Sequence, residues 1–177
     1  FHTMIIRGGG LGASLFKDGH HCAIFPANGA NTPVEILESD TPLLVVAREL
    51  VPDSGGPGKM RGGLGRKMLL HVPDDAKAPI PPVAIAVQAG RYRYPPGGLF
   101  KGLPSTKARY LKNDTPADPS GLTLCEPGDT IAFDSAGGGG FGNPFERDIR
   151  AVEKDVMDEY VSPDKAKKNY GVVIDPQ

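Results

Sequence analysis

Short apolar and alternating stretches recur along most of the chain and predict β-strands. Residues 65–72 alternate apolar and polar side chains, which is typical of a strand with one buried face. Residues 43–51 form a nearly continuous apolar run and predict a strand buried on both faces at its start. Residues 83–87 alternate branched and small side chains and predict a third strand. The body of the protein is therefore expected to be rich in β structure.

A turn signal lies between two further predicted strands, at residues 122–124 and 130–133. The intervening sequence, Glu126-Pro127-Gly128-Asp129, has proline and glycine where a type II turn prefers them. We therefore predict a β-hairpin across this region. Prolines at 79–82 and within 113–120 predict loops, because proline is excluded from central strands.

The pattern becomes helical at the end of the chain. Asp148 is placed to cap one helix, and Ser162-Pro163 begins a second, shorter helix that Gly171 ends. Residues 172–174 are predicted to return to a sheet edge. The first helix has an apolar stripe formed by Ile149, Val152, Val156 and Tyr160.

These elements define the expected architecture. The predicted fold class is α+β, with a predominantly antiparallel β body and Gly-rich loops, closed by a C-terminal helical hairpin. We expect a single domain over 1–177, with the β-rich body at 1–146 and the helical tail at 147–177.

Glycine-rich strings interrupt the predicted strands. Gly-Gly followed by Leu or Phe occurs at 9–11, 62–64, 97–99 and 139–141, and the last occurrence belongs to the unbroken run Gly137 to Gly140. Glycine loses more backbone entropy on folding than any other residue, so each run needs a reason. Either the backbone adopts positive φ, or another chain or a ligand approaches too closely for a Cβ. We predict that at least two residues of 137–140 have positive φ and lie near another chain or a cleft.

Composition and charge narrow the class of protein. The chain has 177 residues with 24 glycines and 18 prolines, 39% hydrophobic residues and a formal net charge of −1. The hydrophobic content argues against a disordered chain. The near-zero net charge gives no indication of a basic surface that would bind nucleic acid. No apolar stretch approaches the roughly 20 residues of a membrane span. Cys22 and Cys125 form no CxxC pair, which predicts reduced thiols and a cytoplasmic protein. The first residue, Phe1, is interpreted as lying within a longer protein.

Two nucleotide-binding motifs are only superficially present. Gly8-x-Gly10-x-x-Ala13 resembles a dinucleotide fingerprint, but the turn at Asp18-Gly19 leaves no room for the helix that must follow. Gly58-Lys59 fails as a P-loop because Met60 stands where a magnesium-binding Ser or Thr belongs. No ATP site is therefore assigned to this chain.

A cluster of possible metal ligands lies at Asp18, His20, His21 and Cys22. Adjacent histidines in an extended chain point to opposite sides, and the spacing matches no closed ligand set. We favour a solvated turn, so no metal ligand is assigned.

Two candidates for acid–base or nucleophilic chemistry each have a simpler structural interpretation. Ser54 follows Asp53 and precedes glycines. A serine nucleophile needs a base, and few histidines are available in this chain, so we favour a structural turn. Glu35 and Glu38 would share one face if their segment is helical, whereas a capped surface turn explains the same residues. Catalytic residues stay unassigned.

Backbone amides of the Gly-rich loops could hold a carboxylate, a phosphate or a ring amide, with charge added by an arginine. Tight turns and bulges of a compact β fold are the competing interpretation, which we favour. The predicted substrate-binding residues are Asp53, Ser54, Gly55, Gly56, Arg61, Gly138, Gly139 and Gly140.

Several strings together resemble the C-terminal part of the hydantoinase B family, which is shared with 5-oxoprolinase and with acetone and acetophenone carboxylases. The resemblance covers essentially the whole chain in order, although Ile149 stands where the family commonly has proline. The strings are Gly10, Gly12-Ala13, Lys17-Asp18-Gly19, residues 31–38, 52–59, 61–65, 127–129 and 137–142, Pro144, residues 146–148, Asp155-Val156 and residues 170–173.

The resemblance implies ATP-dependent opening of a cyclic amide as the activity. The alternatives are ATP-dependent carboxylation of a ketone, as a subunit of a ketone carboxylase, and a non-catalytic assembly domain. The resemblance also implies that ATP with magnesium belongs to a hydantoinase A-type partner subunit. It further implies that a metal is possible in the part of the B-type subunit upstream of this chain. The implied partners are the rest of the B-type subunit, the A-type subunit and a small-molecule substrate, in a hetero-oligomer. This chain alone is expected to hold no cofactor and to be inactive.

Overall fold

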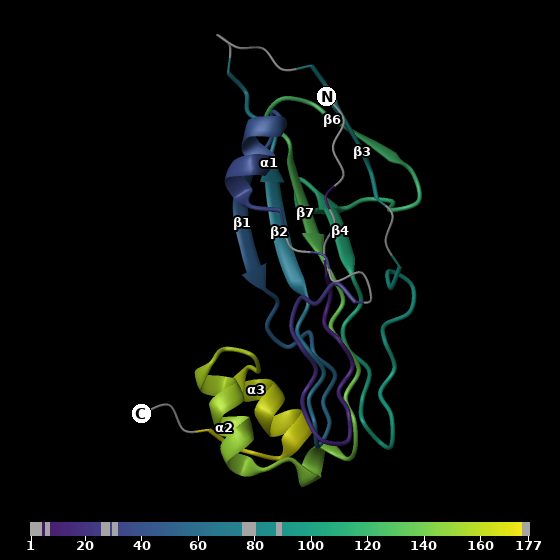
Figure 1. The fold of residues 1–177 in the computed structure, drawn as a ribbon, viewed down its shortest axis with the longest axis vertical. Helices are drawn as coiled ribbons and strands as arrows, with labels where there is room; N and C mark the ends of the chain where they lie inside the picture. Colours follow the sequence, from purple (N-terminus) through teal and green to yellow (C-terminus); the bar gives the residue numbers. More distant parts are fainter. Residues whose placement is uncertain are drawn as a thin grey trace.

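The computed structural model describes residue 5 and residues 8–25, 29, 32–75, 81–87 and 90–174. A β body precedes a helical C-terminal region, which confirms the expected α+β class (Figure 1). The strands are β1 (Leu44–Leu50), β2 (Arg66–His71), β3 (Val83–Ala86), β4 (Arg109–Lys112), β5 (Thr115–Pro116), β6 (Leu122–Cys125) and β7 (Thr130–Asp134). The helical elements are α1 (Val34–Asp40), η1 (Pro144–Glu146), α2 (Ile149–Met157), α3 (Pro163–Lys165) and η2 (Ala166–Tyr170). Among the described residues, no helix has the length and apolar character that a membrane crossing requires.

The main sheet has five strands in the order β1-β2-β7-β4-β5, and every neighbouring pair is antiparallel. The predicted alternation of β2 is confirmed, because Met68, Leu70 and the following Val72 are buried. The register sets Met68 opposite Phe133 and Leu70 opposite Ile131 of β7, so both strands present one apolar face. That face holds the main core.

A second, two-stranded sheet made of β3 and β6 contributes to this core. Val83 of β3 and Cys125 of β6 belong to the same buried cluster as the main-sheet residues, and so does Leu37 of α1. The helix and the small sheet therefore cover the apolar face of the main sheet.

Strand β1 differs from its prediction because it is an edge strand. Leu44 is 45% exposed and Val46 is 58% exposed, so the expectation of burial on both faces is wrong. The register also shifts between Val45 and Ala47, which is a bulge of the kind common at sheet edges.

The turn at 126–129 forms, but the predicted hairpin does not. The Asp129 amide donates to the Glu126 carbonyl, and Gly128 has φ +91°, as the third position of a type II turn requires. The two strands then separate: β6 pairs with β3, whereas β7 pairs with β2 and β4. The hairpin prediction is therefore wrong because partners distant in sequence outcompete the local pairing.

The predicted loop at 113–120 also contains structure. Asn113 and Asp114 have φ of 50° and 59° and connect β4 to the short edge strand β5. Pro116 lies on that edge, where proline is tolerated. The other predicted loop is confirmed at Pro81 and Pro82, which precede β3, whereas Pro79 lies outside the described residues.

Extended segments outside the strands continue the body below the sheet (Figure 1). We call them the glycine layer; they are residues 8–13, 54–65, 97–103 and 135–142. Backbone hydrogen bonds connect them directly: the Gly63 amide donates to Leu11, the Gly138 amide to Gly63, and the Gly56 amide to Gly138, each at 2.8 Å. The layer is therefore held by peptide groups from regions far apart in sequence.

Close packing of backbones explains why this layer needs glycine. A Cβ on Gly10, Gly62 or Gly138 would lie within 3.0 Å of backbone atoms of a neighbouring segment. Among the described glycines, positive φ occurs at Gly142 but at none of residues 137–140, so the prediction of positive φ in that run is wrong. The groups that approach too closely belong to this same chain.

The C-terminal helical hairpin confirms its predicted signals. The Asp148 side chain accepts a hydrogen bond from the Arg150 amide, and the Ser162 hydroxyl accepts one from the Lys165 amide. Pro163 begins α3, and Gly171 ends η2 with φ 72°. These capping signals could be recognised in the sequence because each depends on residues within one helical turn.

Two details of this region differ from expectation. Only part of the apolar stripe of α2 is buried, since Val152 is 0% exposed and Ile149 is 60% exposed. Residues 172–174 form no strand; Val172 and Ile174 instead pack against the helical core. The predicted return to a sheet edge is therefore wrong.

The segment around Glu35 and Glu38 is helix α1 rather than a capped turn, and no side chain caps its first turn. Glu38 accepts a hydrogen bond from the Val45 amide at 2.8 Å, which connects the helix to β1. Glu35 is exposed. The two carboxylates therefore do not act as a pair.

Candidate functional site

The predicted substrate-binding residues come together in the glycine layer, except for Asp53, which immediately precedes its 54–65 segment. Gly55 and Gly56 pack against Gly137 to Gly140, and a Cβ on Gly56 would lie 2.6 Å from the Gly140 amide nitrogen. All of these glycines are buried, and Arg61 is only 3% exposed. In this chain their observed contacts are with other segments of the glycine layer and with the helical tail, and a role in substrate binding stays a prediction.

Ser54 and Asp53 connect backbone segments. The Ser54 hydroxyl donates to the Val51 carbonyl at 2.6 Å and accepts from the Gly65 amide at 2.9 Å, and the residue is 0% exposed. This geometry agrees with the structural turn favoured from sequence. Asp53 has φ 60° and its carboxylate accepts from the Ser162 amide at 2.8 Å. Ser54 therefore fixes the backbone at the start of the 54–65 segment, and Asp53 connects this segment to the helical tail.

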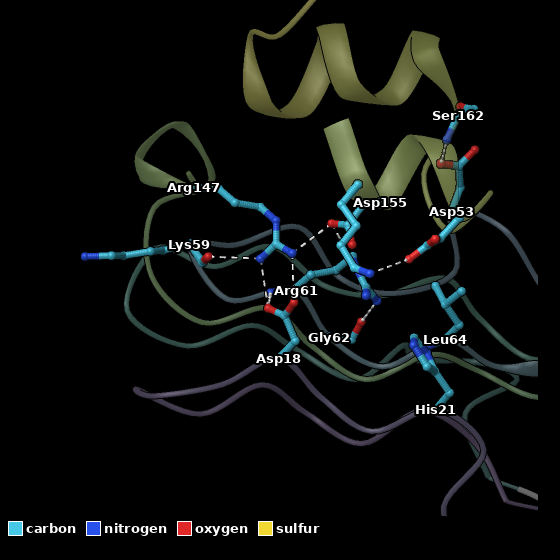
Figure 2. A network of polar contacts seen from close by, with 12 residues as sticks. Asp18, His21, Asp53, Lys59, Arg61, Gly62, Leu64, Arg147, Asp155 and Ser162 are labelled. Carbon is cyan, nitrogen blue, oxygen red and sulfur yellow. Dashed lines mark hydrogen bonds and ion pairs between the residues drawn. The ribbon is translucent and has the colours of Figure 1, made fainter. Parts of the chain in front are cut away.

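A buried ionic network crosses the same junction (Figure 2). Arg147 donates to both carboxylate oxygens of Asp18, at 2.8 and 2.7 Å, and to Asp155 at 2.8 Å. Arg61 Nε lies 3.2 Å from Asp155, so the two arginines share one carboxylate. The Arg61 backbone amide also donates to Asp18 at 2.6 Å. The network thus links the turn after the first glycine segment, the 54–65 segment and helix α2.

Aromatic rings cover one end of the network. The Arg61 guanidinium lies 5.2 Å from the centre of the Tyr160 ring, and the centre of the His21 ring lies 4.7 Å from that same point. His21 Nδ1 accepts a hydrogen bond from the Leu64 amide at 2.9 Å. This bond assigns Nδ1 as the acceptor and uses His21 to hold the backbone in place.

The charges of the network shift the pKa values of its members. Burial raises the pKa of Asp18, but the hydrogen bonds and charge of Arg147 and the Arg61 amide outweigh burial and hold it below its ordinary value. Burial and the Arg61 charge both lower the pKa of His21. His21 is therefore neutral at pH 7, and Asp18 is ionised.

An open pocket of about 540 Å³ lies beside the network. Its lining has both signs of charge, with Lys17 and Lys59 as the cations and Glu146 and Asp148 as the anions. Asp18 and Arg147 also line it, but their charged groups are already paired with each other. The arrangement offers a polar surface of mixed charge beside the network.

The structure also locates the possible metal ligands. Asp18 pairs with Arg147, His20 Nε2 lies 3.4 Å from Lys17 Nζ, and His21 binds a backbone amide. Within the described part of the chain, no group of three His, Cys, Asp or Glu side chains could hold a metal ion. The solvated-turn interpretation agrees with His20, which is exposed, and is wrong for Asp18, His21 and Cys22, which are half-buried.

Sequence reasoning missed the network because its members are far apart along the chain. Asp155 carried one usable signal: it precedes Val156 on the buried side of α2, where an unpaired carboxylate would be costly. Arg147 gave a weaker signal, standing between the acidic residues Glu146 and Asp148. Neither signal identifies Asp18 as the partner.

Tyr170 supplies a test of the buried environment. It is 5% exposed, and its hydroxyl has no hydrogen-bond partner among the described residues. Burial raises its pKa from 10.0 to about 12; the Asp155 charge adds to this shift, and the Arg147 charge opposes it. A pKa raised by folding means that stability is complete below pH 10 and declines as the pH rises towards 12.

Replacing Tyr170 with phenylalanine is therefore expected to change the free energy of unfolding by less than about 0.5 kcal/mol at pH 8. Between about pH 10 and pH 11.5 the variant should become more stable than the unchanged protein by about 1 kcal/mol, because it has no hydroxyl to ionise. Urea unfolding at several pH values measures this difference. Parallel stability curves over that range would contradict the raised pKa.

The fold and the site together define a β-rich protein whose glycine and charged strings build the glycine layer and the junction that attaches the helical tail to it. Residues 1–144 match the family model described as Hydantoinase B/oxoprolinase. The chain belongs to the hydantoinase B/oxoprolinase family, which confirms the resemblance seen in the sequence.

Several relatives are subunits of enzymes. The beta subunit of caprolactamase from Pseudomonas jessenii is 31% identical over 98% of this chain and 31% of that protein. A protein of Pseudomonas sp. strain NS671, provisionally named as the B subunit of a D-/L-hydantoinase, is 32% identical over 97% of this chain and 29% of that protein. The alpha subunit of acetone carboxylase from Xanthobacter autotrophicus is 28% identical over 93% of this chain and 26% of that protein.

A solved structure agrees with these relationships. The crystal structure of the ATP-dependent caprolactamase from Pseudomonas jessenii superposes on this chain with a TM-score of 0.73 and 29% identity, over 94% of this chain and 30% of that one. The chain spans between about a quarter and a third of the length of these relatives.

Proposed function

We propose that this chain is the C-terminal part of the B-type subunit of an ATP-dependent cyclic-amide hydrolase. The observation that carries the proposal is its similarity to the beta subunit of caprolactamase over 98% of its length, supported by the matching solved structure. Caprolactam and hydantoin are both cyclic amides, so two of the relatives described above point to the same substrate class.

The proposed role of this part is to shape the substrate cavity and the subunit contacts. The glycine layer is a rigid array of peptide groups, and such groups can stabilise developing charge without generating a nucleophile. Asp53, Ser54, Arg61 and the glycines around Gly138 would then hold that wall in place. We assign ATP with magnesium to an A-type partner subunit and any metal to the rest of the B-type subunit. The unpaired thiols of Cys22 and Cys125 support a cytoplasmic location.

Ketone carboxylation is the second candidate. It is favoured by the similarity to the alpha subunit of acetone carboxylase, at 28% identity over 93% of this chain. The two chemistries differ in their co-substrate, since carboxylation consumes bicarbonate and amide hydrolysis does not. A non-catalytic assembly role is the third candidate, and the close backbone packing of the glycine layer is compatible with it.

The assembled enzyme that contains this chain should open at least one cyclic amide in an ATP-dependent reaction. Hydantoin, 5-oxoproline and caprolactam are tested with and without ATP, and acetone and acetophenone with and without bicarbonate, by measuring ring-opened or carboxylated product. The 177-residue chain alone is the control and is expected to show neither turnover nor calorimetric ATP binding. Bicarbonate-dependent product from a ketone would overturn the hydrolase assignment in favour of a carboxylase.

A further inference from the structure

One turn of the glycine layer has an unusual combination of backbone and side chains. In residues 99–102 the Gly102 amide donates to the Leu99 carbonyl at 2.9 Å, which closes a four-residue turn. Both central residues are left-handed: Phe100 has φ 50° and Lys101 has φ 72°. Bulky residues rarely adopt this conformation, which favours Gly, Asn and Asp.

The chain contains a matched turn that follows the usual preference. Asn113 and Asp114 have φ of 50° and 59° at the β4–β5 connection, where residues suited to the conformation are present. A tight turn alone therefore does not explain Phe100-Lys101. Residues held in a strained backbone conformation often have a functional role. The strain at Phe100 and Lys101 therefore points to a role for a side chain of this turn.

The turn is rigidly attached to the glycine layer. The Leu99 amide donates to Gly140, the Gly142 amide donates to Leu99, and the Gly140 amide donates to Leu103, at 2.9 to 3.0 Å. A Cβ on Gly102 would overlap the Gly140 carbonyl, so the turn has no room to shift towards the layer. The backbone at Phe100 is thus held in one position.

The side chains at this turn are apolar and exposed. Phe100 is 75% exposed, Leu99 is 61% exposed and Leu103 is 40% exposed. The Phe100 ring lies against the edge of the layer, with its centre 4.9 Å from that of Phe141. A rigid aromatic side chain with apolar neighbours is the kind of residue that dominates protein–protein contacts.

We propose that the turn at residues 99–103 is a docking surface, with Phe100 as its anchor, for the part of a B-type subunit that lies outside these 177 residues. The relatives are about three times as long as this chain, so most of such a subunit is available to cover the surface. The inference rests on the proposed membership of a B-type subunit and is independent of which reaction that enzyme performs.

Hydroxyl-radical footprinting tests whether the surface becomes covered. The oxidation rate of Phe100 is measured in the 177-residue chain and in the assembled enzyme, each normalised to a free reporter peptide. We expect the rate to fall by about five-fold or more on assembly, as for other residues buried in an interface. An unchanged rate overturns the proposal. Because no substrate is used, this result is distinct from a failure of the hydrolase assignment.

Two matched variants separate anchoring from backbone strain. Phe100→Asn and Lys101→Asn each relieve one left-handed position, but only the first removes the aromatic ring. We expect Lys101→Asn to shift Tm equally in the chain and in the assembled enzyme. Phe100→Asn should lower the Tm of the assembled enzyme by about 3 °C or more relative to its effect on the chain alone. Equal shifts for Phe100→Asn in both contexts also overturn the proposal, because the ring would then contribute only within this chain.

Discussion

Replacing Gly138 with alanine is expected to destroy the folded state of this chain. The added Cβ would overlap the Leu11 carbonyl of the neighbouring segment, and backbone atoms cannot rotate aside as a side chain can. The Gly138 amide and carbonyl are both hydrogen-bonded within the layer, to Gly63 and Gly56, so a shift of this segment breaks bonds on two sides. We expect a loss of at least about 4 kcal/mol, which is in the exceptional range for one substitution.

Gly97 is the control within the same layer. A Cβ at Gly97 would have nothing within 4 Å, and its φ is not positive. Alanine at this position should leave stability unchanged or raise it by up to about 1 kcal/mol, because it restricts the unfolded chain. Urea unfolding followed by circular dichroism compares the two variants. If Gly138→Ala unfolds at the same urea concentration as Gly97→Ala, the close-packed layer does not exist as described.

Replacing Asp155 with asparagine is expected to cost about 3 to 5 kcal/mol of unfolding free energy. Asp155 is 5% exposed and forms ion pairs with both Arg147 and Arg61, which are themselves buried. Without its negative charge, Arg61 loses its ion pair and Arg147 keeps only Asp18. The large effect comes from leaving a buried arginine uncompensated, since an intact buried pair contributes much less than its removal costs.

Asp158, one turn later on the same helical region, provides the comparison. Its carboxylate lies 3.4 Å from Lys154, whose side chain is 76% exposed. Asp158→Asn should change stability by less than about 0.5 kcal/mol, as expected of an exposed i,i+4 pair. Chemical denaturation of both variants at pH 7 gives the ratio of the two effects. Similar small losses for both would mean that the buried network is not needed for folding.

Local signals in the sequence predicted the elements whose causes are local. The caps at Asp148 and Ser162 and the alternation of β2 each depend on neighbours within a few residues, and all three are confirmed. The strands β6 and β7 do not pair with each other, because β3 pairs with β6, and β2 and β4 pair with β7. A turn sequence at Gly128 carries no information about these pairings, so the hairpin prediction failed.

The candidate site shows the same division. Sequence indicated that the glycine runs needed a special explanation, and close approach was one of two possibilities. It could not show that the approaching backbone is Leu11 against Gly138, because these two residues are far apart in the sequence. The sequence leaves Asp18 as a possible metal ligand for the same reason: its partner Arg147 is 129 residues away.

The glycine layer also constrains the order in which the protein can assemble during synthesis. Its segments are separated by long stretches of chain; the Ser135 hydroxyl, for example, contacts the Gly8 carbonyl across 127 residues. Contacts of such long range form late, because the entropy of closing the intervening loop must be overcome first. The ribosome must release the segment at 135–142 before residues 8–13 can contact it, although their contacts with the 54–65 segment can form earlier. Until then the earlier segments expose peptide groups whose partners have not been made, so completion of this layer depends on synthesis of residues 135–142.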